Sequence, residues 1–352
     1  MGNITFLLLY LVLAFVLAFA ITPFYIKMLH KFHLGKQIRE EGLVGKAIEF
    51  AKLHAFKTGT PTMGGGMILG VVGILVILSI VFLYFGTEIQ GIIGSKIKYS
   101  LWNRNETYLS LFTLFTVGLL GLVDDYMNVK GIGRTKGISA KFKMLWLILF
   151  GALGAYWFYF KLGHTSFNLP FFGNLNLGLF YIPIFIFIII SMANAVNITD
   201  GLDGLAGGLL LFNYVVYAII TYNQNLFILS ALCMIIVGTL IAFLWFNIKP
   251  AKFYMGDVGA LALGANLGII AMMTNTLIVL IIISGIYILE ILSSLIQVTS
   301  KKLRKGKKVF RIAPFHHHLE AIGWKEESVV MRFWLIGMIL SSVGLLVSFL
   351  LK

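Results

Sequence analysis

The sequence predicts an all-α, multi-pass membrane protein, because its composition is strongly apolar and its apolar residues fall into long, separate runs. Of 352 residues, 59% are hydrophobic and only 12% are charged, whereas about a quarter are charged in a soluble domain. Many runs approach the roughly 20 residues that a helix needs to cross a bilayer, which is longer than the strands of a membrane barrel. We therefore expect one integral-membrane domain over residues 1–352, built from helices.

Ten of these apolar runs are long enough to be transmembrane helices. The first is too long for the apolar part of a signal peptide and lacks a basic segment before it, so we expect it to be retained as a span. The predicted spans are residues 4–26, 63–86, 108–124, 143–160, 179–196, 205–222, 226–246, 258–273, 277–299 and 332–351.

The distribution of basic residues predicts the orientation of the spans. The loops after spans one, three, seven and nine hold 22 of the 28 Lys and Arg. By the positive-inside rule these loops are cytoplasmic, and both termini are then periplasmic, on the outer side. Every Asp and six of the seven His fall on the inner side. The net charge of +14 therefore follows from membrane topology and does not indicate a nucleic-acid partner.

Two loops suggest further structure. Apolar residues alternate around Gly173-Asn174 in the outer loop between spans four and five, which predicts a short periplasmic β-hairpin near residues 165–179. The basic run from Lys301 to Lys308 is expected to lie against anionic lipid headgroups on the inner side.

The first candidate site segment is Asp124-Asp125, where the third span meets a loop that contains Lys130 and Lys136. An ionised carboxylate is costly in hydrocarbon, so an acidic pair at a membrane edge indicates function. An acidic helix end lying in the headgroups is the alternative interpretation. Adjacent carboxylates repel each other, so one would have a raised pKa unless a cation or metal ion lies between them.

The second segment runs from Asn194 to Gly204 and contains two amides, Asn194 and Asn197, and two acids, Asp200 and Asp203. Its Asp-Gly-x-Asp-Gly core lacks the spacing of a calcium-binding EF-hand loop. Helical spacing would place both acids on one face, while glycines such as Gly201 let a ligand approach the backbone. A plain connection between spans would not need this set of residues.

The third segment is Tyr254-Met255-Gly256-Asp257, at the start of the eighth span. A single carboxylate there could simply cap its helix. In company with the other acids, Asp257 is better interpreted as the ligand of a hard cation. Mg²⁺ prefers one or two carboxylates together with substrate phosphates, so we expect a magnesium cofactor at Asp257.

The fourth segment is Pro314-Phe315-His316-His317-His318. Three consecutive residues of a helix point about 100° apart, so these histidines cannot form a zinc site by themselves. One or two of them could contact phosphate or move a proton.

Together the four segments predict a pocket on the inner face with acids, cations and a divalent metal, open to lipid. That combination suits phosphoryl transfer from a soluble phosphorylated donor to a lipid acceptor.

Five motifs, in this order, resemble the phospho-N-acetylmuramoyl-pentapeptide transferases, within the polyprenyl-phosphate N-acetylhexosamine-1-phosphate transferase superfamily. They are Thr60 to Gly65, Val123 to Tyr126, Asn194 to Gly204, Met255 to Asp257 and Pro314 to His318. The resemblance implies transfer of phospho-MurNAc-pentapeptide from its UDP donor to undecaprenyl phosphate in the bacterial inner membrane, giving lipid I and UMP. It also implies a requirement for Mg²⁺, a homodimer, and inhibition by nucleoside antibiotics of the muraymycin and tunicamycin types.

The resemblance also implies roles for individual residues. Asp257 matches the family's metal ligand, and Asp124 and Asp125 match its essential aspartate pair. Tyr254 stands where an aromatic ring stacks on uracil. The remaining matches lie around the nucleotide and the inhibitor pocket: Lys57, Thr62, Asn194, Asp200, Asp203 and Gln297, with His316 and His317 beside them.

Two questions stay open at the level of sequence. The family usually has a Lys two residues after Asp-Asp-Tyr, where this chain has Asn128, so Lys130 or Lys136 would supply that charge. Direct displacement, with Asp124 as base, competes with a covalent aspartyl-phosphate intermediate. The alternative functions are a UDP-GlcNAc:polyprenyl-phosphate transferase and, in another class, a secondary transporter, whose repeats and midplane acids the sequence does not show.

Overall fold

The computed structural model describes residues 3–35, 41–42, 45–46, 57–93, 100–102, 105–133, 137–169 and 173–350, and helices make up most of them. The α-helices are α1 (Asn3–Lys31), α3 (Gly65–Ile93), α4 (Asn105–Val129), α5 (Ala140–Tyr156), α6 (Tyr181–Thr199), α7 (Leu205–Asn223), α8 (Phe227–Asn247), α9 (Gly256–Met273), α10 (Leu277–Ile283), α11 (Gly285–Leu303), α12 (Phe315–Ala321) and α13 (Glu326–Leu350). A π-helical turn (Trp157–Lys161) extends α5, and a 3₁₀ turn (Gly178–Phe180) precedes α6.

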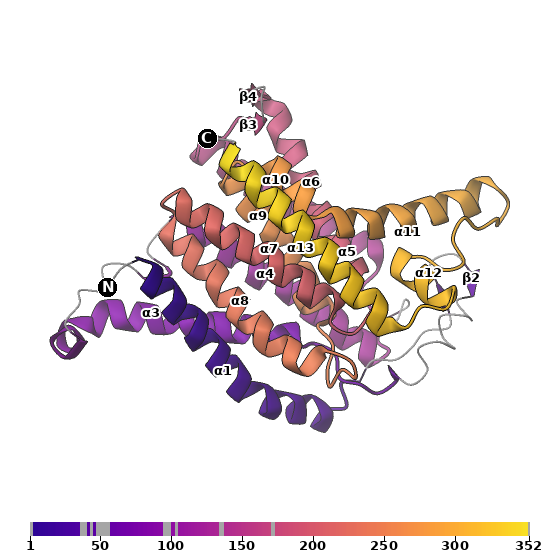
Figure 1. The fold of residues 1–352 in the computed structure, drawn as a ribbon, viewed down its shortest axis with the longest axis horizontal. Coiled ribbons are helices and arrows are strands. Elements are labelled where there is room, and N and C mark those ends of the chain that lie inside the picture. Colours follow the sequence, from indigo (N-terminus) through magenta and orange to yellow (C-terminus); the bar gives the residue numbers. More distant parts are fainter. Residues whose placement is uncertain are drawn as a thin grey trace.

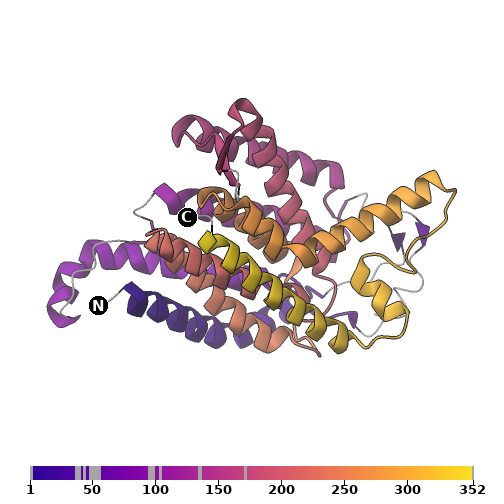
Figure 2. The ribbon, with the colours of Figure 1, turned by 45° about the horizontal axis from the view of Figure 1, so that its top comes forward.

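Within the described residues, nine helices are long and apolar enough to cross a membrane, or ten if the bent pair α10 and α11 counts as one span. This agrees with the predicted all-α, multi-pass fold. The first residues of α1 and the last of α13 lie on the same side of the molecule, away from α12 (Figures 1 and 2). An even number of crossings returns the chain to the side on which it started.

The ninth predicted span, residues 277–299, is not one straight helix. α10 and α11 meet at an angle of 72°. The break falls at Ser284, whose ψ of 9° departs from the helical value, and Gly285 follows it. A Cβ on Gly285 would lie 2.8 Å from Cδ1 of Leu340 in α13, so the missing side chain permits close packing at the bend. Beyond it, α11 projects from the bundle (Figure 1).

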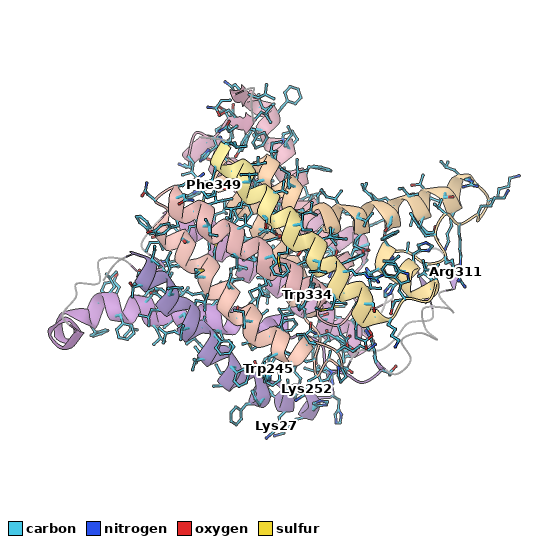
Figure 3. The ribbon with its side chains drawn as sticks, in the orientation of Figure 1. Lys27, Trp245, Lys252, Arg311, Trp334 and Phe349 are labelled. Atoms are coloured by element: carbon cyan, nitrogen blue, oxygen red, sulfur yellow. The ribbon has the colours of Figure 1, made fainter. Side chains whose placement is uncertain are left out.

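The polar and apolar faces of α11 are inverted relative to a soluble protein. Its buried side includes Glu290, Ser293 and Gln297, whereas Leu292 and Leu295 are exposed. Apolar residues facing outward are expected where lipid is the solvent. α1, α5 and α13 also carry many exposed apolar side chains. Figure 3 draws the side chains of these helices.

The centre of the bundle consists of α8 and α9. α1 and α7 pack on α8, while α4 and α6 pack on α9. α3 also approaches α9 closely, because a Cβ on Gly65 would collide with the backbone of Gly259. α9 is therefore surrounded by the helices that carry the other acidic motifs.

The predicted hairpin is present. β3 (Ser166–Leu169) pairs with antiparallel β4 (Gly173–Asn176). The backbone N–H of Asn168 donates to Oδ1 of Asn275 over 3.1 Å, which ties the hairpin to the α9–α10 connection. A second, very short antiparallel pair, β1 (Glu41–Gly42) with β2 (Gly45–Lys46), was not predicted.

Candidate active site

An acidic cluster forms where the end of α4, the end of α6 and the start of α9 meet. Nζ of Lys143 lies 2.6 Å from Oδ2 of Asp124 and 2.7 Å from Oδ2 of Asp257. Nδ2 of Asn197 donates to Oδ1 of Asp257 over 2.8 Å. The structure thus brings three of the four predicted segments together, and one ammonium group bridges two of the carboxylates.

Gly121 positions this cluster, because it lets α4 lie directly against the first turn of α9. A Cβ at Gly121 would collide with the backbone of Asp257 and Val258. Asp124 follows three residues later, about one helical turn on, and therefore points at the same region. Its Oδ1 accepts a hydrogen bond of 2.6 Å from the backbone N–H of Ile138.

Two further aspartates accept hydrogen bonds from backbone amides at the start of α9. Oδ2 of Asp125 accepts from Val258 N over 3.3 Å, and Oδ2 of Asp200 accepts from Gly256 N over 3.2 Å. The first amides of a helix have no partner within the helix and carry partial positive charge, so carboxylates are stabilised there. Gly256 has a φ of +71°. A Cβ there would lie 2.7 Å from Oγ1 of Thr62, which places Thr62 at the same turn.

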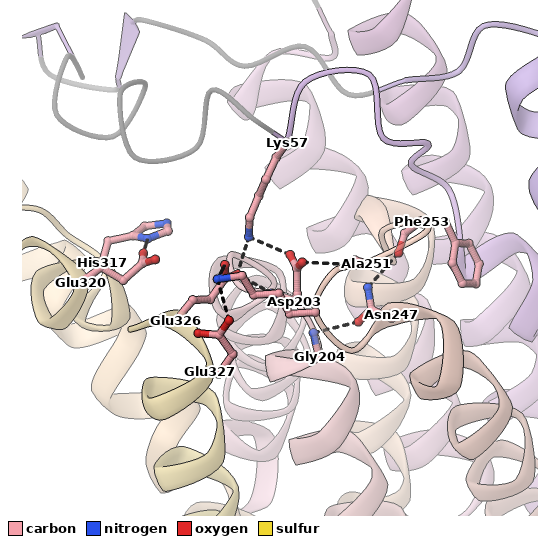
Figure 4. Close-up of polar contacts among 11 residues, drawn as sticks. Lys57, Asp203, Gly204, Asn247, Ala251, Phe253, His317, Glu320, Glu326 and Glu327 are labelled. Atoms are coloured by element: carbon pink, nitrogen blue, oxygen red, sulfur yellow. Dashed lines mark hydrogen bonds and ion pairs between the residues drawn. The ribbon is translucent and has the colours of Figure 1, made fainter. Parts of the chain in front are cut away.

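A second network surrounds Lys57 (Figure 4). Nζ of this buried lysine donates to Oδ1 of Asp203 over 2.7 Å and also to Oε1 of Glu326. Glu326, at the start of α13, accepts from the backbone N–H of Asp203 over 2.9 Å and pairs with Lys249 over 3.1 Å. Despite the opposing effect of partial burial, the carboxylates of Glu326 and Glu327 raise the pKa of Lys249. Each ionised side chain in this network therefore has at least one partner of opposite charge.

The loop between α8 and α9 is held against this network. Asn247 accepts from Gly204 N over 3.0 Å and donates to the carbonyl of Phe253 over 2.8 Å, as Figure 4 shows. Burial, with a further contribution from the charge of Asp203, raises the pKa of Tyr254 above its usual value, so its side chain stays a neutral phenol. The carbonyl of Tyr254 accepts from Gly64 N over 2.7 Å, which joins this loop to the predicted glycine turn.

Two histidines face the turn between α6 and α7. Nδ1 of His316 lies 2.9 Å from Oε2 of Glu290, and Nδ1 of His317 lies 2.7 Å from Oε2 of Glu320. A Cβ on Gly201 would collide with Nε2 of His316 and lie 3.2 Å from Nε2 of His317. The fourth predicted segment therefore meets the second at Gly201.

Some predicted site residues lie apart from these groups. Gln297 bonds the backbone of Val309 and Phe310 and so holds the loop before α12. Nζ of Lys130 donates to the carbonyl of Phe32 at the surface. Nδ2 of Asn194 donates to Ile190 within its own helix. Lys136 lies outside the described residues.

The acidic cluster suits a hard cation, although it is not a complete metal cage. Among the described residues, no group of three or more His, Cys, Asp or Glu is arranged to hold an ion. Asp124 and Asp257 nevertheless both approach one ammonium nitrogen, so their oxygens converge on a cationic centre. Two carboxylates leave coordination positions for substrate phosphates and water, as Mg²⁺ prefers.

Comparison with known proteins identifies the family of the chain. Residues 107–275, which span α4 to α9, match the model of glycosyl transferase family 4. A phospho-N-acetylmuramoyl-pentapeptide-transferase from Geobacillus sp. is 39% identical over 343 residues, which cover 95% of this chain and 97% of the relative. The chain belongs to the phospho-N-acetylmuramoyl-pentapeptide transferase family. Relatives with the same name from Anoxybacillus flavithermus, 37% identical over 95% of both chains, and from Oceanobacillus iheyensis, 36% identical over 97% of this chain and 98% of the relative, support this assignment.

Three residues of the candidate site in this transferase were not predicted from the sequence. Lys143 was counted only as a loop cation, although it bridges Asp124 and Asp257. Glu290 is the only carboxylate within its predicted span, and a lone intramembrane acid is a signal that could have identified it. Glu326 precedes the predicted start of the last span, so it was assigned to a loop.

Proposed function

We propose that this protein transfers phospho-MurNAc-pentapeptide from UDP-MurNAc-pentapeptide to undecaprenyl phosphate, giving lipid I and UMP in peptidoglycan synthesis. The observation that carries the proposal is the near full-length match to transferases of this name, at 39% identity over 95% of the chain. The convergence of Asp124, Asp200 and Asp257 at one end of the bundle supports it, because transfer between two phosphates needs several charged groups at one place.

Asp257, with Asp124 beside it, would hold Mg²⁺. When bound, the ion offsets negative charge on the donor pyrophosphate. Lys143 occupies the place between these carboxylates in the structure, and with Mg²⁺ bound it would move to a phosphate oxygen of the donor. The second network orients the nucleotide: Lys57 and Asp203 offer a cation and an acceptor, and Tyr254 offers a ring for uracil. His317, whose Nε2 faces Gly201, would contact the donor on the opposite side.

The contacts of Asp124 favour direct displacement over a covalent intermediate. Oδ1 accepts from Ile138 N, and Oδ2 is paired with Lys143. A carboxylate engaged at both oxygens is a poor nucleophile. Asp124 would act as the base of a direct displacement only after Lys143 has left Oδ2. The acceptor phosphate is largely ionised at neutral pH, its second pKa being about 6, so it needs alignment more than activation.

The proposed environment is the inner membrane of a bacterium, with the acidic cluster on the cytoplasmic face. The resemblance further supports a homodimer and inhibition by muraymycin- and tunicamycin-type nucleosides. An inhibitor that mimics uridine would be expected to compete with the donor at Lys57 and Asp203.

The function can be tested with protein purified in detergent. UMP release should require both UDP-MurNAc-pentapeptide and undecaprenyl phosphate, should stop on chelation of Mg²⁺, and should be lost in Asp257→Ala. UDP-GlcNAc serves as the matched control donor and should not be consumed. Equal turnover of UDP-GlcNAc would assign the chain to the other branch of the superfamily, and binding without turnover would point to a carrier.

A further inference from the structure

The ammonium group of Lys143 lies between the two carboxylate oxygens that a divalent cation would share. Its Nζ is 2.6 Å from Oδ2 of Asp124 and 2.7 Å from Oδ2 of Asp257. The second oxygen of each carboxylate already accepts a hydrogen bond. Oδ1 of Asp124 accepts from the backbone N–H of Ile138, and Oδ1 of Asp257 accepts from Nδ2 of Asn197. The two Oδ2 atoms are therefore the ones that converge, and they converge on Lys143.

An ammonium group and a magnesium ion cannot occupy this position together. Mg²⁺ lies about 2.0–2.1 Å from its oxygen ligands, so an ion held by both Oδ2 atoms would overlap the ammonium group. Charge opposes joint occupancy as well. The two ionised carboxylates and Lys143 carry a net charge of −1, which a divalent ion beside the retained lysine would turn into +1. Like charges a few ångströms apart repel strongly where little water separates them.

Of the three charged groups, Lys143 is the one that can move. Its backbone is fixed in the first turn of α5, where the side chain of Ser139 accepts from Phe142 N. The charge, however, stands at the end of a flexible four-carbon stem. The side chain of Lys143 is 27% exposed, whereas that of Asp124 is 5% exposed. The ammonium group can therefore leave the carboxylates while α5 stays in place.

We propose that Lys143 is an internal counter-ion that competes with the divalent cation for Asp124 and Asp257, so that the metal binds only as the ammonium group is released. The inference rests on the proposed function for its choice of metal. Lys143 then has two effects of opposite sign. It relieves the repulsion between the carboxylates, and it lowers their affinity for the metal.

The test is Lys143→Met, which removes the charge and keeps the length of the side chain. Binding of Mn²⁺, a paramagnetic substitute for Mg²⁺, is measured in detergent from the electron paramagnetic resonance signal of the free ion, without donor or acceptor. We expect Kd to fall at least about 10-fold, because the competing cation is gone. An unchanged or higher Kd, or no detectable binding by Lys143→Met, would overturn the proposal.

Three further variants show that the effect belongs to this charge at this site. Lys141→Met removes an exposed lysine from the same helix and should leave Kd within about twofold of wild type. Lys143→Arg keeps the charge, so its Kd should not fall, and tightening equal to that of Lys143→Met would contradict competition. In a Lys143→Met background, Asp257→Ala should abolish the tightening; if it persists, the ion is bound elsewhere and the proposal fails.

Labelling of the unaltered protein gives a second measurement, which decides the question even if Lys143→Met does not fold. Wild-type protein is treated with acetic anhydride with and without Mg²⁺, and the modification of each lysine is followed by mass spectrometry. Mg²⁺ should speed modification of Lys143 at least about threefold, since two charge-assisted hydrogen bonds otherwise shield the group. Modification of Lys141 should not change. Equal rates at Lys143 with and without Mg²⁺ would overturn the proposal.

These measurements need no substrate, so they separate this inference from the proposed function. A wild-type protein that releases no UMP would refute the proposed function, while the competition between Lys143 and the cation would still be decided by Kd and by labelling. Conversely, an active enzyme whose metal affinity does not depend on Lys143 would refute the competition alone.

Discussion

At the scale of single residues, Lys143 explains how Asp124 and Asp257 can lie side by side. Two neighbouring carboxylates repel each other, and removal from water strengthens the repulsion. One ammonium group within 2.7 Å of both relieves it. Under the proposed function the same group would also contact a phosphate oxygen, which would link the stability of the site with its chemistry.

Replacing Lys143 should therefore abolish turnover. In Lys143→Ala we expect UMP release to fall by at least about 100-fold, since a charge that stabilises the transition state contributes about 3 kcal/mol. The matched control is Lys141→Ala, because Lys141 lies two residues earlier on α5 and is exposed. Its rate should stay within about twofold of wild type. Equal rates in the two variants would remove Lys143 from the mechanism.

Glu326 should matter for stability as well as for donor binding. Glu326→Gln takes one of two carboxylates from buried Lys57, and such a change costs about 1–3 kcal/mol. Thermal unfolding in detergent should show a lower Tm, and the donor KM should rise. The control is its neighbour, Glu327→Gln, whose side chain is 56% exposed and whose loss should cost less than about 0.5 kcal/mol. A Tm shift of similar size in both variants would contradict the assignment.

The sequence made the aspartates predictable because they are few and stand at the ends of apolar runs. Lys143 and Glu290 were not recognised for opposite reasons. Lys143 is one of many cations that the positive-inside rule already explains. Glu290 stands alone in an apolar segment, and its partner His316 is 26 positions away, so only the folded chain brings the two together.

At the scale of elements, the fit between α4 and α9 sets the distance between the two aspartates. Gly121→Ala would force these backbones apart, because its Cβ would meet main-chain atoms of Asp257 that cannot rotate away. A displacement of about 1 Å can reduce catalysis about 100-fold. We expect UMP release to fall by that factor.

The control for this variant is Gly70→Ala on α3. No atom lies within 4 Å of the Cβ that this substitution adds, so activity should be unchanged. Alanine is also a better helix former than glycine by about 1 kcal/mol. If Gly121→Ala retains full activity, the close approach of the two helices does not set the geometry of the site.

The helices themselves were predictable, but the bend between α10 and α11 was not. Periodicity and length identify apolar segments, and residues 277–299 satisfy both criteria. At the bend Gly285 packs against Leu340, a contact between segments that are separate in the sequence. The hairpin was predictable because its signal, alternation around Gly173-Asn174, is local.

At the scale of the whole molecule, the orientation can be tested with cysteine labelling. Asn174→Cys in the hairpin and Lys302→Cys near the end of α11 both place a thiol at an exposed position. In intact cells a membrane-impermeant maleimide should label the first and not the second, and permeabilisation should expose both. Cys233 is buried and serves as the native control, unlabelled throughout. The reverse pattern would invert the proposed topology.

The contact between Lys57 and Glu326 has a consequence for how the protein is made. It joins positions 269 residues apart, one before α3 and the other in the first turn of α13. At a translation rate of about 5–20 residues per second, the ribosome needs on the order of ten seconds to a minute to proceed from one to the other. A nascent chain thus holds its buried lysine without this carboxylate until the last helix is inserted. The Lys57–Glu326 pair can therefore close only after α13 has left the ribosome, whereas the contacts of Lys143 with Asp124 and Asp257 need no residue beyond α9.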